Sequence, residues 1–214
     1  MTKYLSVLLI ACLPIISCGQ IKNGKEAKGL IINKNIKVEV EKHIESSKEF
    51  DAFNDKISVY KNSLLVEAYE NDKLIYSPKV NTPKQLFKSF YLWKGDTLKI
   101  DGGFGLFTGF GFTVNVYKNT ATVYHLLSSD ESPAFAYKEG DKLIPRLEVL
   151  CSQTKIILSE LPDSLKNQTI YGYVEFKSDN YYVSSGTISG KETLPRKKQR
   201  TNMKIYFKSE RLKI

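Results

Sequence analysis

Apolar and polar side chains alternate with a period of two residues along most of this chain of 214 residues. In the segment IKVEV at 36–40, three apolar side chains share one face and two charged side chains share the other. Such alternation is typical of β-strands that bury one face. Clusters of turn-forming residues interrupt the pattern at intervals of roughly ten residues, the spacing expected of an antiparallel sandwich or barrel. The sequence therefore predicts an all-β fold of one of these two architectures.

Polar turns divide the expected strands into hairpins. An opening hairpin is expected from 30–32 and 36–40, with the turn at 33–35. Further pairs are expected at 64–69 with 74–76, 86–93 with 97–100, 110–117 with 121–127, 134–137 with 143–144, and 171–176 with 181–183. A last strand is expected at 203–207. The 13 tyrosines and 11 phenylalanines favour a sheet, because aromatic side chains pack well on a pleated surface.

One short helix is expected near the start of the folded region. Ser46 and Glu49 have the spacing of a capping box, in which both side chains satisfy free backbone N–H groups of the first turn. Phe50, Phe53 and Ile57 follow at helical spacing and form one apolar stripe. This stripe would pack on the sheet. The expected fold class is thus all-β, a mainly antiparallel sandwich or barrel, with one short N-terminal helix.

The first residues of the chain have the pattern of an export signal. Lys3 and the terminal amine precede an almost unbroken apolar run at 4–16, which is too short to span a bilayer. The string IISCG at 15–19 follows, with a small residue directly before Cys18. This string resembles the lipobox of bacterial lipoproteins, in which diacylglycerol is attached to the cysteine sulfur and the signal peptidase cuts before it.

The resemblance implies that residues 1–17 are a lipoprotein signal peptide and that Cys18 is the acylated first residue. Residues 18–29 are polar, contain glycine and lack periodicity, which predicts a flexible tether. Residues 30–214 are then a single, mostly β domain. Several acyl chains anchor a protein firmly, whereas one gives only marginal binding. The expected location is the cell envelope, with the protein lipid-anchored to a membrane and facing the periplasm.

Outside the signal peptide, the likeness is one of composition alone. The chain is rich in Asn, Lys, Ile and Tyr, and in this it resembles small uncharacterised lipoproteins of the Bacteroidota. This compositional resemblance transfers no functional residue beyond Cys18.

Charge and cysteine content narrow the function classes. The net charge of +9 suits anionic headgroups or an anionic partner, while nucleic acid is not an expected partner of an exported lipoprotein. Cys12 would leave with the signal peptide and Cys18 would be acylated, so Cys151 has no disulfide partner and is expected to be a buried apolar thiol. His43 and His125 are the only histidines, so neither a metal site nor any cofactor beyond the covalent lipid is expected.

No catalytic constellation is recognisable in the sequence. His125 alternates with apolar residues and is expected to face the core. Nothing like Gly-x-Ser-x-Gly marks a nucleophile, and the acid pairs at 130–131 and at 139 and 141 fall in expected turns.

The most unusual segment is GGFGLFTGFGF at 102–112. Its glycine spacing fits neither a dinucleotide fingerprint nor a P-loop. In a strand, alternating Gly and Phe would leave one face bare, which occurs where a sheet bends sharply or where something approaches the backbone closely. Two interpretations follow, a strongly coiled strand at a barrel corner or a surface for an apolar ligand or partner. The candidate residues for the second are Phe104, Phe107, Phe110 and Phe112.

A dense basic run precedes the last expected strand. It comprises Arg196, Lys197, Lys198 and Arg200, in a stretch of low apolar content. We expect an exposed loop there. The loop is either simply solvated or docks on anionic lipid phosphates, at roughly 1 kcal/mol per basic residue near such a surface.

Together these features predict a non-enzymatic lipoprotein of the cell envelope that acts as a binding or assembly component. The first alternative is a β-barrel that binds a lipid or other apolar ligand behind the Phe-Gly segment. The second is a hydrolase that uses carboxylates, which would require two carboxylates converging in one cleft.

Overall fold

The computed structural model of the protein describes residues 30–46, 59–63, 65–77, 84–104, 109–118, 120–130, 132–188 and 191–212. Within these ranges the chain forms one helix, α1 (Ile36–His43), and 16 strands. The strands are β1 (Leu30–Ile32), β2 (Ile44–Ser46), β3 (Val59–Asn62), β4 (Leu65–Glu70), β5 (Lys73–Tyr76), β6 (Gln85–Lys94), β7 (Thr97–Phe104), β8 (Gly109–Tyr117), β9 (Thr120–Ser128), β10 (Phe135–Ala136), β11 (Arg146–Leu158), β12 (Thr169–Ser178), β13 (Tyr181–Val183), β14 (Thr187–Ile188), β15 (Lys191–Glu192) and β16 (Lys197–Arg211).

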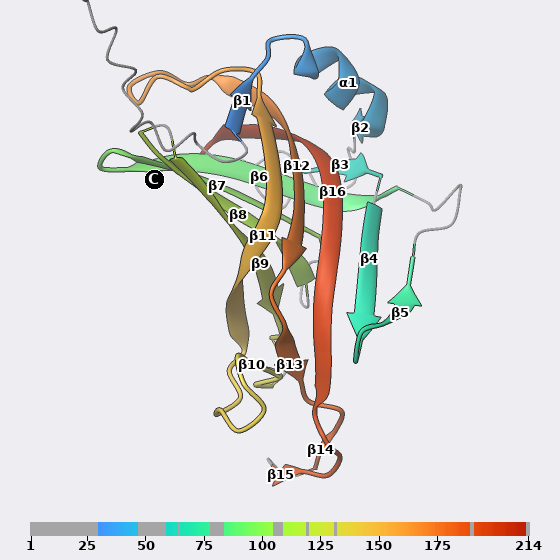
Figure 1. The fold of residues 1–214 in the computed structure, drawn as a ribbon. Helices are drawn as coiled ribbons and strands as arrows, with labels where there is room; N and C mark the ends of the chain where they lie inside the picture. The colour runs from blue at the N-terminus through green and yellow to red at the C-terminus, as the bar shows by residue number, and fades with distance from the viewer. Residues whose placement is uncertain are drawn as a thin grey trace, which may run out of the picture.

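The strands form one large, mainly antiparallel sheet that closes on itself. The order β6-β7-β8-β9-β11-β12-β16 is continuous, and Figure 1 shows β11, β12 and β16 in front of β7, β8 and β9. β16 returns to β6 through a short parallel pairing, with Glu210 opposite Phe90 and Arg211 opposite Tyr91. At this seam the hydroxyls of Ser89 and Ser209 meet, both buried. The described residues therefore have the expected all-β fold, in a barrel-like form.

Further strands extend the ring at its edges. β4 and β5 continue the sheet beyond β16, as the right-hand side of Figure 1 shows. β1 pairs in parallel with the far end of β11, and β14 and β15 form a separate small hairpin.

Side chains alternate strictly between the inside and the outside of the ring. Along β7 and β12 every second residue is buried, as expected of strands with one face on a core. The interior is filled by large side chains that are fully or almost fully buried, including Phe87, Tyr91, Phe112, Phe176 and Phe207.

Two inward-facing glycines make room for these aromatic rings. A Cβ at Gly102 would lie 2.7 Å from the rings of Phe112 and Phe87, and a Cβ at Gly172 would overlap the ring of Phe207. Gly111 plays a different part, because its Cβ would overlap the backbone of β7 at Gly102. β7 and β8 can approach this closely only without a side chain there, so the sheet coils sharply at this point.

Helix α1 replaces a strand expected from the sequence. In the segment 36–40, Ile36 and Val40 are buried one helical turn apart, while Val38 is 56% exposed. Three apolar residues at every second position therefore fit a helix as well as a strand, and the charged residues between them favour helix. The predicted opening hairpin is thus wrong. Apart from Ser46 in β2, the helix expected from the capping box lies outside the described residues.

Helix α1 covers the outer face of β12 and β16. The ring of His43 stacks on Tyr206 with centroids 4.2 Å apart, and the ammonium of Lys37 lies 5.2 Å from the centroid of the Tyr171 ring.

Three of the expected hairpins occur with left-handed turn residues. The β4–β5 turn contains Asn71 and Asp72 with φ of 48° and 64°, the β6–β7 turn contains Gly95 with φ of 56°, and Lys118 after β8 has φ of 54°. Positive φ at these positions suits the tight turns that join twisted antiparallel strands. The hairpin at 134–144 is reduced to β10 and a single bridge between Phe135 and Ile144.

The hairpin expected at 171–183 is not formed. β12 and β13 do not pair with each other, since both pair with β16, one after the other along its length. The polar residues at 177–180 therefore interrupt one long course of chain and do not reverse it. The last strand is also longer than the expected 203–207, because pairing with β4, β12 and β13 extends it over Lys197–Arg211.

The glycines give a direct test of the coiled sheet. Gly111→Ala is expected to lower the free energy of unfolding by about 3 kcal/mol, since overlap with backbone is not relieved by a side-chain rotation. Gly103→Ala is the matched control, because its Cβ would meet only the Phe110 carbonyl at 3.7 Å. We expect that change to be neutral or to stabilise by up to about 1 kcal/mol. Equilibrium unfolding in urea measures both, and equal stabilities of the two variants would contradict the coiled geometry.

Candidate binding groove

The Phe-Gly segment contributes mainly to the core. Phe104 and Phe112 are 3% and 0% exposed, and Phe110 is half-buried against the interior cluster. Phe104 and Phe110 also line the edge of an outer recess. Phe107 lies outside the described residues. The described phenylalanines are therefore chiefly packing residues. β7 and β8 fit the first of the two interpretations of this segment, a strongly coiled strand.

A ligand enclosed by the ring finds no support in this packing. Phe87, Phe112 and Phe207 contact one another across the interior, with ring centroids 6.3 Å apart for the first pair and 5.1 Å for the second. These rings occupy the space that the apolar-ligand alternative assigned to a cavity.

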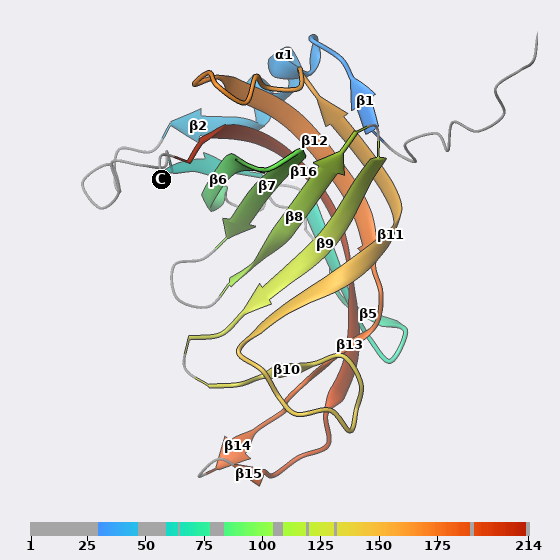
Figure 2. The ribbon, with the colours of Figure 1, turned by 90° about the vertical axis from the view of Figure 1, so that its left-hand side faces the viewer.

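The coiled part of the sheet has a groove on its outer face. It has a volume of about 580 Å³ and adjoins a recess of about 210 Å³. Both lie over β6, β7, β9 and β11, and the recess also lies over β8. Figure 2 shows these strands with β12 and β16 behind them. Across the groove Lys88 lies opposite Gly103, Gly103 opposite Gly111, and Gly111 opposite Leu126. The bare glycine positions form the floor.

Coiling brings residues of distant strands to one recess. Lys88 on β6 and Arg146 on β11 are four strands apart in the sheet, yet both line the smaller recess. In a flat sheet four strand spacings correspond to about 19 Å. The apolar part of the groove is formed by Phe90, Leu126 and Tyr137. Local sequence patterns do not indicate this assembly, because it depends on the curvature of the whole sheet.

Gly103 on the groove floor is not required by the packing of the chain. Unlike Gly102 and Gly111, it has space for a side chain, and its φ is not in the left-handed region. A glycine in a strand weakens it by about 0.5–1 kcal/mol relative to alanine. A bare position that the fold does not need is typical of a surface that something approaches closely.

Some charged side chains in the groove are already ion-paired, and others form no ion pair with any described residue. The ammonium of Lys99 lies 3.3 Å from the carboxylate of Asp101, which also accepts a hydrogen bond from the Thr113 hydroxyl. Lys88 and Arg146 are exposed and form no ion pair or hydrogen bond through their side chains with any described residue. Asp130 in the recess and Glu148 in the groove are acidic lining residues.

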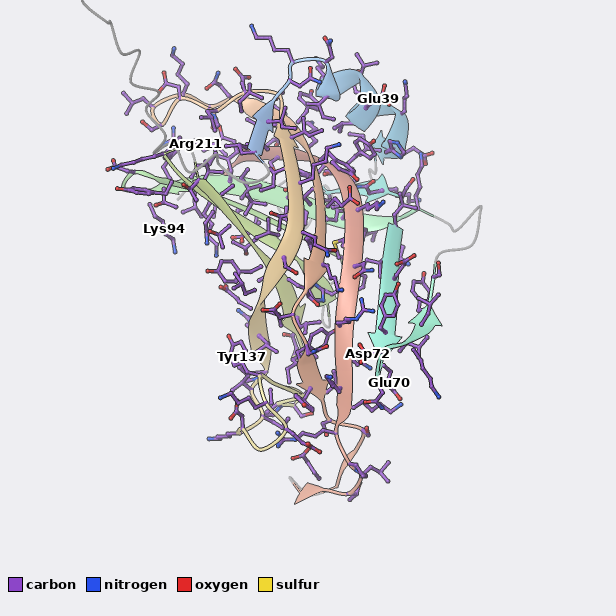
Figure 3. All side chains as sticks on the ribbon, in the orientation of Figure 1. Glu39, Glu70, Asp72, Lys94, Tyr137 and Arg211 are labelled. Atoms are coloured by element: carbon purple, nitrogen blue, oxygen red, sulfur yellow. The ribbon has the colours of Figure 1, made fainter. Side chains whose placement is uncertain are left out.

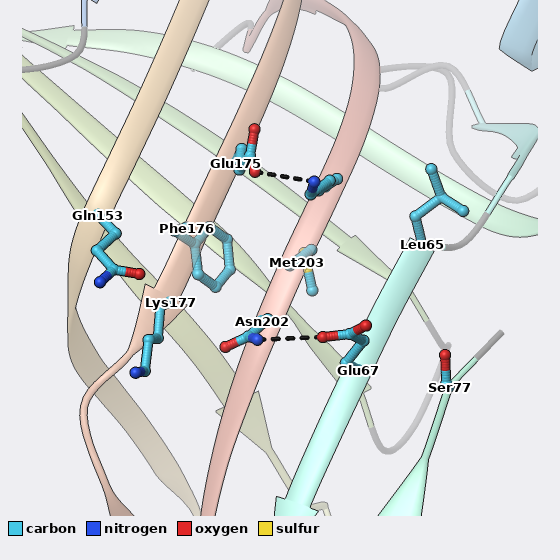
Figure 4. Close-up of a pocket in the computed structure, with 10 residues that line it drawn as sticks. Leu65, Glu67, Ser77, Gln153, Glu175, Phe176, Lys177, Asn202 and Met203 are labelled. Carbon is cyan, nitrogen blue, oxygen red and sulfur yellow. Dashed lines mark hydrogen bonds and ion pairs between the residues drawn. The ribbon is translucent and has the colours of Figure 1, made fainter. Parts of the chain in front are cut away.

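A second, polar groove of about 410 Å³ lies on the outer face of β4, β12 and β16 (Figure 4). It contains two carboxylates, Glu67 and Glu175. Glu67 accepts hydrogen bonds from the Tyr69 hydroxyl at 2.8 Å and the Asn202 amide at 3.1 Å. Glu175 pairs with Lys204 at 3.0 Å and accepts from the Tyr173 hydroxyl at 2.8 Å.

Glu175 does not have the raised pKa of the general acid in a carboxylate hydrolase. Burial alone would raise the pKa of Glu175, but hydrogen bonds from Lys204 and Tyr173 outweigh burial and hold its pKa below the usual value. A general acid requires a raised pKa. The arrangement is that of an ion-paired sheet surface.

Arg196 in the basic run is bound within the fold. It donates two hydrogen bonds from Nε and Nη2 to the Glu192 carboxylate, at 2.9 and 2.6 Å. Its Nη1 also donates to the carbonyls of Glu139 and Asp141, at 2.5 and 2.6 Å. Its side chain is 12% exposed. Arg196 thus clamps the approach to β16 onto the turn after β10.

The rest of the basic run belongs to β16, so the expected exposed loop is wrong for these residues. Arg200 lies 3.8 Å from the centroid of the Tyr69 ring and 3.5 Å from Asp72, and Lys197 pairs with Glu70 at 3.1 Å. Figure 3 labels Glu70 and Asp72 beside β16. Pairing with β4 and β13 draws this polar sequence into the sheet. Lys198 is half-buried, and its side chain has no ion pair among the described residues.

The remaining titratable candidates are structural. His125 is 1% exposed and its Nδ1 lies 2.9 Å from the carbonyl oxygen of Gly111. Burial raises the pKa of the Cys151 thiol to about 12, as expected for an apolar and unreactive cysteine. Among the described residues no cluster of His, Cys, Asp and Glu could hold a metal ion, and no helix in those ranges is long and apolar enough to cross a membrane.

Comparison of the chain with protein-family models, curated proteins and solved structures finds no match to any of them. The groove and the N-terminal sequence are therefore the features of the chain that bear on its function.

Arg196→Ala is expected to lower the free energy of unfolding by about 2 kcal/mol, because it removes the charged hydrogen bonds that this largely covered side chain donates to Glu192 and to two carbonyl groups. Lys198→Ala is the matched control from the same run, with an expected change within about 0.5 kcal/mol. Urea unfolding of the two variants measures the difference. If Arg196→Ala proves as mild as Lys198→Ala, the clamp does not stabilise the fold.

Acid should destabilise the protein through His125. Burial lowers its pKa from 6.5 to about 4, although the hydrogen bond to the Gly111 carbonyl partly opposes this. Between these pH values the unfolded chain binds a proton that the folded protein does not, so stability falls as the pH falls from 6.5 to 4, by about 3 kcal/mol from this group. Unfolding free energies across this range measure the slope. His125→Gln should flatten it and His43→Gln should retain most of it; an unchanged slope in His125→Gln would rule out the assignment.

Proposed function

We propose that this protein is a non-enzymatic lipoprotein of the bacterial cell envelope that binds a ligand or partner in its outer groove. A lipid on Cys18 would tether it to a membrane, on the periplasmic side, and residues 18–29 would connect the anchor to the domain. The lipobox-like string at 15–19 supports the anchor.

The observation that carries the binding role is the bare floor of the groove at Gly103. The interior is filled by aromatic rings, so the space for a ligand lies outside the ring. Its volume of about 580 Å³ falls within the range of small-molecule sites, which run from roughly 300 to 1,000 Å³. Apolar walls at Phe90 and Leu126 with a few polar groups also fit such a site. An envelope protein that inserts a side chain or a strand over Gly103 is the other occupant.

Cys18→Ala is expected to leave the protein without lipid and released from the membrane, because the acylated thiol is then absent. Metabolic palmitate labelling and membrane fractionation measure this. Cys151→Ala is the matched control and should keep both label and membrane attachment. Normal labelling of Cys18→Ala would overturn the anchor.

Native mass spectrometry of the lipidated protein, gently extracted from its own membrane, tests the binding role. We expect a discrete added mass or a co-purifying protein that is lost in Gly103→Leu, since leucine would occupy the groove. Gly140→Leu is the matched control, because a Cβ at Gly140 meets nothing within 4 Å and Gly140 does not line the groove. A bound species that survives Gly103→Leu would overturn the groove as the binding site.

A further inference from the structure

We infer that the outer groove binds an amphiphilic anion, with its apolar body on Phe90 and Leu126 and its carboxylate or phosphate between Lys88 and Arg146. This inference rests on the proposed function and specifies the chemistry of the ligand for the same groove.

The first support is the pair of cations that the coiled sheet brings together. Lys88 and Arg146 line the same recess from strands four positions apart, and neither has a partner among the described side chains. Elsewhere on the surface, most of the arginines and several lysines are paired, for example Lys197 with Glu70 and Lys204 with Glu175. An anion between two otherwise unpartnered cations gains charge-assisted hydrogen bonds, and an arginine fork suits carboxylate or phosphate.

The second support is the shape of the recess between the two cations. Its floor includes Gly103, where a Cβ would meet only the Phe110 carbonyl at 3.7 Å, so a ligand group can reach the level that Cβ atoms occupy elsewhere in the sheet. The main groove continues from this recess along Phe90 and Leu126, next to the exposed ring of Tyr137. A charged head and an apolar body thus have adjoining places.

The acidic lining residues set the limits of this electrostatic selection. Asp101 is already neutralised by Lys99 at 3.3 Å. Asp130 lines the recess and Glu148 lines the main groove, and both oppose an anion. Neutralising a basic residue of the lining is therefore expected to weaken binding of the anion, and neutralising an acidic one is expected to strengthen it.

The test is calorimetric titration of the full lipidated chain in phosphatidylcholine nanodiscs with octyl phosphate and octanoate, with empty nanodiscs subtracted. We expect saturable binding of one molecule. Lys88→Gln with Arg146→Gln should weaken it by at least about tenfold, the effect of losing charged contacts of ordinary strength. Asp130→Asn should strengthen it, and Gly103→Leu should abolish it. Lys94→Gln, on the same strand but outside the groove, is the matched control; Figure 3 shows Lys94 well apart from Tyr137.

Other probes distinguish an amphiphilic anion from a free anion, and a wrong ligand class from a wrong binding site. Octyl glucoside has the same tail without charge, and binding as tight as that of octyl phosphate would overturn the inference. Binding of inorganic phosphate as tight as that of octyl phosphate would reduce the site to a free-anion site and also overturn it. If no anionic amphiphile binds, but Gly103→Leu removes the species found by native mass spectrometry, the ligand class is wrong and the binding function stands. A species that persists in Gly103→Leu overturns both.

Discussion

The backbones of β7 and β8 pass so closely at Gly102 and Gly111 that a side chain on the second would overlap the first strand. This approach coils the sheet and shapes both of its faces. On the inside, Gly102 leaves the space that Phe112 and Phe87 occupy. On the outside, the same coil brings β6 toward β11 and forms the groove. A single local constraint thus sets the packing of the interior and the position of the candidate site.

Features of this fold that depend on neighbouring residues can be predicted from the sequence, and features that depend on distant residues cannot. The turns at Asn71 and Gly95 were predictable, because small or polar residues with positive φ stand between alternating segments. The strand expected at 36–40 is wrong, since the spacing of Ile36, Val38 and Val40 fits a strand or a helix, and packing on β12 and β16 adds to the helix preference of the charged residues between them. No sequence pattern indicates that Lys88 and Arg146 lie close together. The one sign of a site there is Gly103, a strand glycine that the packing does not require.

The basic run at 196–200 shows that a cluster of charges in the sequence does not by itself predict an exposed basic surface. A cluster of cations in sequence indicates an exposed, attractive surface, yet Arg196 is bound to carbonyl groups 55 and 57 residues away. The cations of the recess, which have no partner among the described side chains, come instead from the isolated positions Lys88 and Arg146, and no run of charge marks them. Charge that is available to a ligand is what the fold leaves unpaired, and local density of lysine and arginine does not measure it.

β16 pairs with β4, β6, β12 and β13, and its pairing with β6 closes the ring. Two of these partners, β4 and β6, lie far back in the chain, so the loops that must close before the seam forms are long, and such topologies fold slowly. A chain synthesised from its N-terminus has no closed ring until Glu210 and Arg211 are available. During synthesis the meander β6–β9 therefore has an open edge and uncovered aromatic side chains, a state suited to binding by a chaperone.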